Sequence, residues 1–392
     1  MTGSRKILEA RFADIKTKFR EIPEFADFVS GLQEQLDDLV GSMTHKLEVD
    51  FEAYNPVNFF HALRLQASEG GATRTLEEMG TGEQQILAMA FAHAYARAFH
   101  EGVVLIIEEP EAHLHPLAQQ WLAKKLKEMT ADGLQTLITT HSPAFVDILG
   151  LEGLVVVRKS AGSTSVKQID RHQLRQRCIE MGVPPARVTV ANILPFYAAS
   201  ATREILEGFF AQVVVLVEGP TEALALPVYL ERIGLSVAKE GIAIIPVFGK
   251  GSLGKWWRLF RAYDIPCYVI FDNDAEDDEG GGKRRDALTA IGIPEPEQGG
   301  LVATDAWLVG EHFSVFGADF ETALRQALPG YDQLEEDASQ QGIKTKPFIG
   351  RWVAERAVLD EGTAGRDRLN QLADRLRAKL PAIAVPEAGA PD

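Results

Sequence analysis

The sequence predicts an α/β protein whose sheets are mainly parallel. Two observations support this fold class: short, wholly apolar runs occur at residues 103–107, 213–217 and 267–271, and each run is followed at once by acidic residues. Apolar runs of this length are typical of strands buried on both faces, in sheets that helices cover on each side. Ligands and metals collect at the carboxyl edge of such sheets. The acidic residues therefore mark candidate functional sites.

Length and composition bound the class of protein. A chain of 392 residues predicts about two or three domains, and 46% apolar with 24% charged residues is ordinary for a globular protein. No apolar run reaches the roughly 18 residues of a membrane span, and the N-terminus lacks the apolar core of a signal peptide. With only two cysteines, Cys178 and Cys267, we expect a cytoplasmic protein in a reducing compartment.

The net charge of −16 argues against a general nucleic-acid coat protein. It does not argue against a metal-dependent nuclease, because carboxylates that bind divalent ions add negative charge that the ions neutralise. Basic residues lie on both sides of the third apolar run. We predict that Lys250, Lys255 and Arg258, before it, contact DNA phosphates, and residues 283–285 form a second basic patch after it. A solvated helix face is the alternative for each patch.

The N-terminal region is predicted to be helical. Apolar residues recur at spacings of three and four over residues 5–47, with an interruption at Pro23. Two alternatives are open for this pair of helices. It is a helical arm or dimerisation hairpin, or it packs on its own domain. Strands are expected around Pro56, between residues 49 and 67.

A glycine-bracketed turn, residues 80–84, opens a long apolar helix at residues 86–99. Such a turn exposes backbone N–H groups to an anion, as phosphate-binding turns do. The first apolar strand then ends in Glu108 and Glu109, and a later strand, residues 137–140, ends in His141.

In this order and spacing, the turn and the two strand ends resemble the second half of an ABC-type ATPase. The resemblance implies a signature motif that contacts the nucleotide of the opposite subunit, made of Gly80, Gly82, Glu83 and Gln84. It also implies that Glu108 lies near Mg²⁺, that Glu109 orients the attacking water and that His141 lies near the γ-phosphate. A zinc site built from His113, His115 and His141 is the alternative.

The phosphate-binding loop that ATP requires is missing from this pattern. Residues 249–256 nearly match its consensus, but Trp256 stands where a hydroxyl must hold Mg²⁺, and the match follows the acidic strand instead of preceding it. We therefore expect the chain to be the C-terminal part of a longer protein. ATP is expected as a cofactor of that longer protein only, and the fragment alone is not expected to hydrolyse it.

The second apolar strand, residues 213–217, leads into Glu218, and Glu222 falls in the first turn of the helix predicted at residues 221–233. The third strand leads into Asp272-Asn273-Asp274. Because side chains alternate along an extended chain, Asp272 and Asp274 share one side and Asn273 points away. Carboxylates without Cys or His suit Mg²⁺, Mn²⁺ or Ca²⁺. A solvated acidic loop beside a helix N-cap is the alternative.

A strand-end Glu followed by a strand-end Asp-x-Asp resembles the Toprim domain, the catalytic fold of topoisomerases, primases and certain nucleases. ABC-type ATPase elements that run into a Toprim domain resemble the overcoming-lysogenisation-defect (OLD) nucleases, and here the resemblance covers Leu76 to Trp352. It implies DNA nicking and cleavage with two divalent ions, Mg²⁺ or Mn²⁺ with Ca²⁺ as an alternative. It also implies an ATPase half that regulates cleavage, and a homodimer.

The resemblance assigns site residues one by one. Glu218 and Glu222 match the first acidic motif, and Asp272 and Asp274 match the Asp-x-Asp. Asp319, Glu321 and Lys346 match a later acidic motif and a basic residue near the end of the domain. Hydrolysis with two metals needs several carboxylates from different segments. Glu218 and Asp272 are the central ligands because rigid strands position them; Asp319 is either a ligand or only a helix cap, and Lys346 either stabilises the transition state or is a solvated lysine.

These interpretations give three segments: an ATPase region at residues 1–208, a Toprim nuclease domain at 209–380 and a disordered tail at 381–392. Residues 277–279 are expected in a mobile acidic loop. The main alternative function is an ATP-gated DNA-binding or recombination-type clamp whose acids hold a structural ion without cleavage. Topoisomerase chemistry needs a tyrosine nucleophile, and none of the 7 tyrosines lies in a recognisable context.

Overall fold

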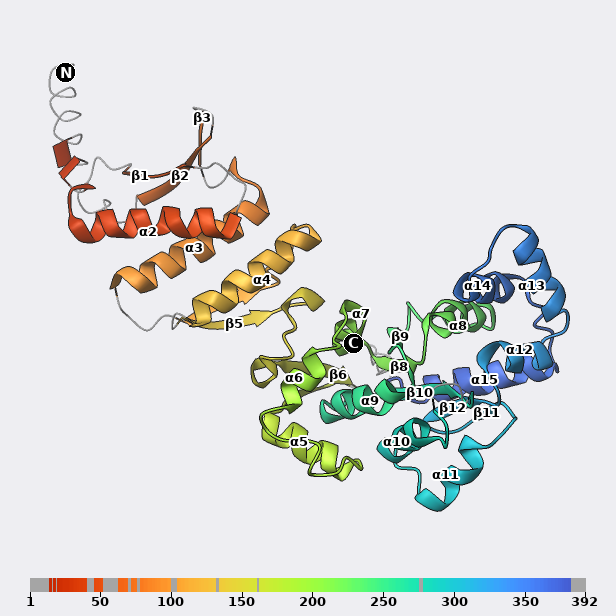
Figure 1. Ribbon diagram of the computed structural model, residues 1–392. Coiled ribbons are helices and arrows are strands. Elements are labelled where there is room, and N and C mark those ends of the chain that lie inside the picture. The colour runs from red at the N-terminus through yellow and green to blue at the C-terminus, as the bar shows by residue number, and fades with distance from the viewer. Residues whose placement is uncertain are drawn as a thin grey trace, which may run out of the picture. The chain divides into compact units, whose positions relative to one another are not determined.

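The computed structural model divides the chain into two compact units, Met1–Phe145 and Val146–Asp392 (Figure 1). The structure describes residues 14–15, 17–18, 20–40, 46–51, 63–69, 72–75, 78–99, 104–131, 134–160, 162–274 and 278–381. Most of the tail predicted to be disordered, from residue 382 on, lies outside these ranges, as do residues 1–13 of the predicted N-terminal helices.

The described part of the first unit combines the long helices α2, α3 and α4 with two small sheets. Strands β1, β2 and β3 form an antiparallel sheet, and β4 pairs with β5 in parallel. The elements are α2 (Pro23–Val40), β1 (Lys46–Phe51), β2 (Leu63–Glu69), β3 (Ala72–Thr75), α3 (Thr81–Phe99), β4 (Val104–Glu108), α4 (Pro116–Ala131), β5 (Gln135–Thr139) and η3 (Pro143–Phe145).

Helix α2 packs within its own unit. Its apolar residues Phe28, Leu32, Leu36 and Leu39 recur at spacings of three and four, so they share one helix face, and all four are buried in the core that α3 and α4 complete. Of the two alternatives for the N-terminal helices, the described part of α2 supports packing on its own domain.

The second unit is a parallel sheet with helices on both faces, preceded by a hairpin and short helices. The preceding elements are η4 (Leu151–Gly153), β6 (Val155–Ser160), β7 (Ser163–Gln168), α5 (Arg171–Glu180), α6 (Ile193–Ala198), α7 (Arg203–Glu207) and η5 (Gly208–Phe210). The sheet and its helices comprise β8 (Val213–Val217), α8 (Pro220–Arg232), β9 (Ile242–Pro246), η6 (Lys250–Ser252), α9 (Leu253–Ala262), β10 (Cys267–Asp272), α10 (Gly282–Ala290), α11 (Glu295–Val302), β11 (Leu308–Val309), β12 (Phe313–Phe316), α12 (Phe320–Ala327), α13 (Tyr331–Gln340), α14 (Lys346–Arg356) and α15 (Ala364–Arg377).

The sheet has the strand order β11-β12-β10-β8-β9, and only the edge strand β11 runs antiparallel to its neighbour. Alternate residues of β8 enter two separate cores: Val214 and Leu216 pack with Trp256 of α9, whereas Val215 packs with Leu226 of α8.

The predicted α/β class is therefore confirmed, and β8 and β10 are buried on both faces. The same prediction is wrong for β4 and β5, which leave Val104, Ile106 and Leu137 exposed. Burial on both sides holds the ends of β8 and β10 rigidly.

The compact units separate at residues 145/146, earlier than the domain boundary predicted at 208/209. Residues between these positions pack on the sheet of the second unit: Tyr197 contacts Trp256, and the Arg158 guanidinium donates hydrogen bonds to the carbonyls of Ala211 and Gln212. Within the described ranges, no helix is both long and apolar enough to cross a membrane.

Candidate metal centre

The acidic residues at the ends of β8 and β10 meet at one edge of the sheet. The two strands are parallel neighbours, with Val217 opposite Ile270, so Glu218 and Asp272 leave the sheet side by side. Asp272 is buried, and the Glu218 side chain is 21% exposed. This is the convergence that the two strand-end motifs predicted.

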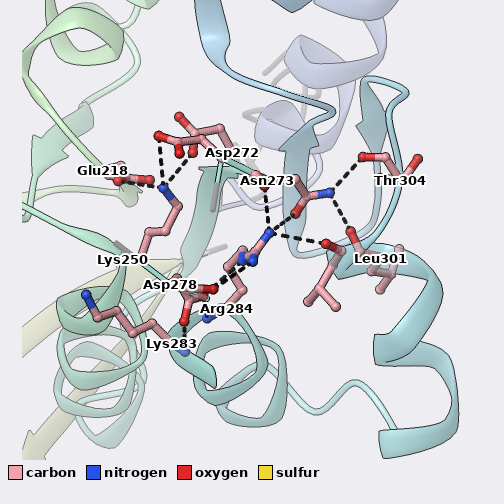
Figure 2. A network of polar contacts seen from close by, with 11 residues as sticks. Glu218, Lys250, Asp272, Asn273, Asp278, Lys283, Arg284, Leu301 and Thr304 are labelled. Carbon is pink, nitrogen blue, oxygen red and sulfur yellow. Dashed lines mark hydrogen bonds and ion pairs between the residues drawn. The ribbon is translucent and has the colours of Figure 1, made fainter. Parts of the chain in front are cut away.

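The Lys250 ammonium lies between these carboxylates (Figure 2). Its Nζ atom is 3.1 Å from Glu218 Oε1, 2.8 Å from Asp272 Oδ1 and 3.7 Å from Asp274 Oδ2. Burial alone would lower the pKa of Lys250, but Asp272 and Glu218 outweigh burial and the pKa lies above its ordinary value. Lys250 is therefore a charged internal partner of the acids.

A short loop after β9 carries Lys250 to this position. Phe248 and Gly249 have positive φ values of 56° and 122°, and only glycine adopts the second without strain. The Gly249 N–H donates to the Glu218 carbonyl at 3.0 Å, which fixes the loop to the end of β8. Lys250 then opens the η6 turn, and its side chain is only 2% exposed.

Glu222 lies close behind Glu218, in the first turn of α8. Its Oε2 accepts the Gly219 N–H at 3.2 Å, and the side chain is buried. Burial raises the pKa of Glu222 to about 8, and the charges of Asp272 and Glu218 add to the shift. Burial, followed by the charge of Asp272, likewise raises the pKa of Glu218 to about 7, and Lys250 opposes that shift. These carboxyl groups share one electrostatic environment.

Asp319 and Glu321 join the centre at the start of α12. Asp319 caps the helix: its Oδ1 accepts the Thr322 N–H at 2.6 Å, and its Oδ2 accepts the Thr322 hydroxyl at 2.9 Å. Burial raises the pKa of Glu321, Asp319 adds to the shift, and the charge of Lys346 opposes it. Glu321 therefore lies within electrostatic range of Asp319 and Lys346. The charge of Glu321 also raises the pKa of Glu222.

Lys346 is the first residue of α14, and its side chain is exposed. Helix α14 lies directly against α8. A Cβ atom added at Gly350 would come within 2.9 Å of Thr221 Cγ2, so glycine permits the close approach. Packing on α8, which also carries Glu222, brings Lys346 to the acidic centre.

A second polar network holds the chain between Asp272 and Asp274 (Figure 2). Asn273 Nδ2 donates to the carbonyls of Leu301 at 2.8 Å and Thr304 at 2.9 Å, so its side chain points away from the acids as predicted. The Arg284 guanidinium donates to the Asn273 carbonyl at 2.8 Å. The backbone at the centre of the Asp-x-Asp motif is thus anchored to α10 and α11.

Asp278 anchors Arg284 in turn, and sequence reasoning missed this pair. The Asp278 carboxylate accepts the backbone N–H groups of Lys283 and Arg284 and the Arg284 Nε–H, and both side chains are buried. The predicted mobile acidic loop is thus corrected at Asp278, which is built into the start of α10; Asp277 lies outside the described residues. Asp278 lies five and six residues before the two backbone N–H groups that it binds. The only sign of this arrangement in the sequence is the glycine-rich turn between them.

The three residues predicted to contact DNA bind other groups of the same chain. Lys250 pairs with the acids as described. Lys255 Nζ donates to the Phe196 carbonyl and to Ser200 Oγ, both at 2.6 Å, and burial lowers its pKa to about 8. Arg258 pairs with Asp286 at 2.6 Å. All three are buried, so this placement does not support them as DNA contacts. The burial of Lys255 and Arg258 follows from the position of α9, which is covered by the sheet on one side and by α5 and α6 on the other.

The centre has the chemistry of a site for a hard divalent cation. Its donors are carboxylate oxygens, the pKa values of four of the acids are raised, and Glu218 Oε2 is buried without a hydrogen-bond donor. In the ranges that the structure describes, no three His, Cys, Asp or Glu side chains already stand in a ligating arrangement. The Lys250 ammonium occupies the space between Glu218 and Asp272.

In the first unit, the predicted signature turn begins α3. Glu83 Oε2 accepts the Gly80 N–H at 3.0 Å, and the Gln84 side chain donates to the Met79 carbonyl at 3.1 Å. Gly82 lies against His113, where an added Cβ would be 3.7 Å from the histidine Cβ. The turn is thus held as a capped helix start.

The other predicted ATPase residues come together at the ends of β4 and β5. Glu108 ends β4, and the Glu109 N–H donates to the Thr139 carbonyl at 2.8 Å. Glu109 Oε1 lies 3.7 Å from His141 Nε2, with both side chains exposed. His115 Nδ1 accepts the Ala118 N–H at 3.3 Å in the first turn of α4, and the described residues show no cluster that would serve as the alternative zinc site.

Two protein-family models match the chain. Residues 209–274 match the model described as overcoming lysogenization defect protein-like, TOPRIM domain, and residues 5–146 match the model described as AAA ATPase domain. The first match contains Glu218, Glu222 and the Asp-x-Asp motif. The second match ends at residue 146, one residue beyond the first compact unit.

Two curated nucleases are similar in sequence to part of the chain. The chain is 30% identical over 231 residues to the OLD nuclease of Thermus scotoductus, which covers 58% of this chain and 42% of the relative. It is 26% identical over 209 residues to the Old nuclease of Escherichia phage P2, which covers 51% of this chain and 34% of that relative. The matched part therefore spans less than half the length of either relative.

A solved structure, the C-terminal region of the Burkholderia pseudomallei OLD protein, is 20% identical with a TM-score of 0.34, and the match covers 42% of this chain and 98% of that one. The family models and the curated relatives confirm the resemblance to the OLD family that the motifs predicted.

Proposed function

We propose that this chain, which is similar to OLD nucleases over part of its length, carries a metal-dependent DNA endonuclease centre at the carboxyl edge of its β8–β10 sheet. The observation that carries the proposal is the meeting of acids from separate segments at one edge, inside the segment that matches the TOPRIM model. Glu218 and Asp272 come from strand ends, and Glu222 and Glu321 come from the first turns of helices.

Glu218, Glu222, Asp272 and Asp274 would hold one or two divalent ions, with Asp319 and Glu321 at the far side. Such ions lower the pKa of a bound water and neutralise charge on a phosphodiester. The chain supplies the rest. The sheet fixes Glu218 and Asp272, the Arg284 network fixes the backbone of the Asp-x-Asp, and the Lys346 ammonium faces the centre from α14 to neutralise charge on the phosphate. We expect Mg²⁺ or Mn²⁺, with Ca²⁺ as an alternative.

The first unit supports a role for nucleotide. Its paired Glu109 and His141 and its capped signature turn would face a nucleotide held partly by a second copy, as in ATPases that dimerise around ATP. DNA is the proposed substrate, and a homodimer is the proposed assembly. The TOPRIM match and the relatives named as nucleases support DNA as the substrate, and the AAA ATPase match over residues 5–146 supports a dimer that forms around nucleotide.

The direct test is a plasmid-nicking assay without ATP, in which Mg²⁺, Mn²⁺ or Ca²⁺ is added to the wild-type chain, to Asp272→Ala and to Lys346→Ala. Lys344→Ala, a change of an exposed lysine two residues away, is the matched control. We expect nicking only with divalent ions. Asp272→Ala should lose at least about a hundredfold in rate because a central ligand is missing, Lys346→Ala about a hundredfold, and the control little.

Two results would count against this proposal. Nicking that continues unchanged in Asp272→Ala would place the chemistry elsewhere. Divalent-ion binding and salt-dependent DNA binding without any nicking would favour the clamp, in which the acids hold a structural ion.

A further inference from the structure

The buried lysine inside the acidic centre is the feature that the proposed function leaves unexplained. Lys250 is 2% exposed at its side chain, so it does not meet a DNA phosphate from this position. Its ammonium lies within 4 Å of three of the proposed ligands, Glu218, Asp272 and Asp274. A cation in this place has the same electrostatic partners as a metal ion would have.

The Lys250 ammonium contacts oxygens that a divalent ion bridging the two strand ends would also need. Its Nζ lies 3.1 Å from Glu218 Oε1 and 2.8 Å from Asp272 Oδ1. A Mg²⁺ ion binds carboxylate oxygens at about 2.0–2.1 Å and keeps waters around it, so it needs the space between those oxygens. The ammonium fills that space.

The loop that carries Lys250 is built to deliver a side chain to this point. Gly249 adopts φ 122°, and its N–H is bonded to the Glu218 carbonyl, so the backbone next to Lys250 is tied to the same strand end as the ligand. Beyond this hydrogen bond, the lysine side chain has four rotatable bonds. It ends in an ammonium group that water can solvate. The backbone can therefore stay in place while the ammonium leaves.

We propose that Lys250 is an internal counter-cation that occupies the ion position between Glu218 and Asp272 when no metal is bound, and that a divalent ion enters by displacing its ammonium. The inference rests on the proposed metal-dependent function. In the metal-free centre the ammonium closes the ion position and offsets part of the negative charge of the acids, so a divalent ion must compete with the lysine to bind. The lysine keeps the buried carboxylates paired until an ion replaces it.

The first test measures divalent-ion affinity by isothermal titration calorimetry with MgCl₂ or MnCl₂. The wild-type chain is compared with Lys250→Met and with Lys255→Met, which removes another buried lysine, one that donates to a carbonyl and a hydroxyl. If the ammonium leaves the site in about one molecule in ten, its removal should tighten ion binding by about tenfold. Lys255→Met should bind as the wild type does.

Equal or weaker ion binding by Lys250→Met, with the control unchanged, would overturn the inference. A thermal-shift measurement on the same proteins gives an independent reading. Lys250→Met leaves buried carboxylates without their cation, so its melting temperature should be lower than that of the wild type without metal and should rise more when divalent ion is added. A variant that added ion does not rescue would contradict the exchange.

The second test needs no variant, so it holds even where Lys250→Met does not fold. The wild-type chain is acetylated with an N-hydroxysuccinimide ester, with and without saturating Mg²⁺, and the modified lysines are quantified by peptide mass spectrometry. Labelling of Lys250 should increase severalfold with Mg²⁺, because the displaced amine becomes accessible, whereas labelling of Lys255 should not change. Labelling of Lys250 that falls or stays constant would overturn the inference.

The outcomes separate this inference from the proposed function. Metal-dependent nicking together with equal ion affinity in the wild type and Lys250→Met would contradict the displacement of Lys250 by the ion. The proposed nuclease function would still stand. The absence of any divalent-ion binding in all three proteins would remove both, since there would be no ion position for Lys250 to occupy.

Discussion

At the scale of single residues, the acids of the centre are costly to ionise together. Burial raises the pKa of Glu222 from 4.5 to about 8 and that of Glu218 to about 7. A carboxyl whose pKa is higher in the folded state binds more protons when folded, so its contribution to stability is present at low pH and is lost as the pH rises through the folded-state pKa. Metal-free protein should therefore lose stability between about pH 5 and pH 8.

Glu222→Gln tests this pH dependence because it removes the most strongly shifted of the acids while keeping an acceptor for the Gly219 N–H. In metal-free calorimetry we expect the free energy of unfolding of the variant to rise relative to that of the wild type as the pH increases, by on the order of 4 kcal/mol near pH 8. Added Mg²⁺ should reduce this difference in stability between the variant and the wild type, because an ion stabilises the ionised wild-type centre. Parallel melting curves for the two proteins across this pH range would contradict the assigned shift.

Arg284 is the residue on which the geometry of the Asp-x-Asp motif depends. Its guanidinium is buried, pairs with Asp278 and donates to the Asn273 carbonyl. Arg284→Met leaves Asp278 as an uncompensated buried carboxylate, and we expect the free energy of unfolding to fall by about 3–5 kcal/mol. Denaturant unfolding measures this loss.

Lys283→Met is the matched control, since Lys283 is exposed and supplies only a backbone N–H to the network. It should change stability by less than about 0.5 kcal/mol. A stability of Arg284→Met close to that of this control would show that the network does not hold the motif.

At the scale of elements, the approach of α14 to α8 sets the position of Lys346. A Cβ at Gly350 would meet Thr221 Cγ2 at 2.9 Å, whereas a Cβ at Gly299 in α11 would meet nothing within 4 Å. We expect Gly350→Ala to cost about 1–3 kcal/mol by overpacking and to slow nicking as Lys346 shifts. Gly299→Ala should gain up to about 1 kcal/mol from helix propensity. Equal effects of the two changes in thermal unfolding would contradict the close packing.

The strands and their terminal acids could be predicted because their signals are local. An uninterrupted apolar run fixes β8 and β10, and alternation alone fixes the opposite directions of Asp272 and Asn273. The burial of Lys250, Lys255 and Arg258 could not be predicted, because whether a basic residue is exposed or buried depends on partners that lie far away in the sequence. Phe196 is such a partner for Lys255, and Asp286 is one for Arg258. The sequence around α9 gives no sign of either contact.

Asp278 illustrates a second limit of sequence reasoning. An acidic residue beside glycines is usually solvated, and only the fold shows that its carboxylate caps α10 and pairs with Arg284. The position of residues 146–208 is a third case. Their packing on α9 depends on tertiary contacts such as that of Tyr197 with Trp256, so the compact units divide earlier than the predicted boundary.

At the scale of the whole molecule, the chain joins a unit that matches an ATPase model to a unit that contains the TOPRIM match. The nuclease centre, as proposed, is complete within the second unit, because every proposed ligand and Lys346 lie between residues 218 and 346. Nucleotide would then regulate cutting without supplying a group to the reaction. This division of roles makes the acidic centre the central claim.

The measurement that tests this claim most directly is anomalous X-ray diffraction from crystals of the chain soaked in MnCl₂. We expect Mn²⁺ at the end of β8 and β10, with oxygens of Glu218 and Asp272 at roughly 2.0–2.3 Å and the Lys250 ammonium displaced. Mn²⁺ bound at other residues, or an acidic centre that keeps its lysine and takes no ion while the chain still nicks DNA, would contradict the account.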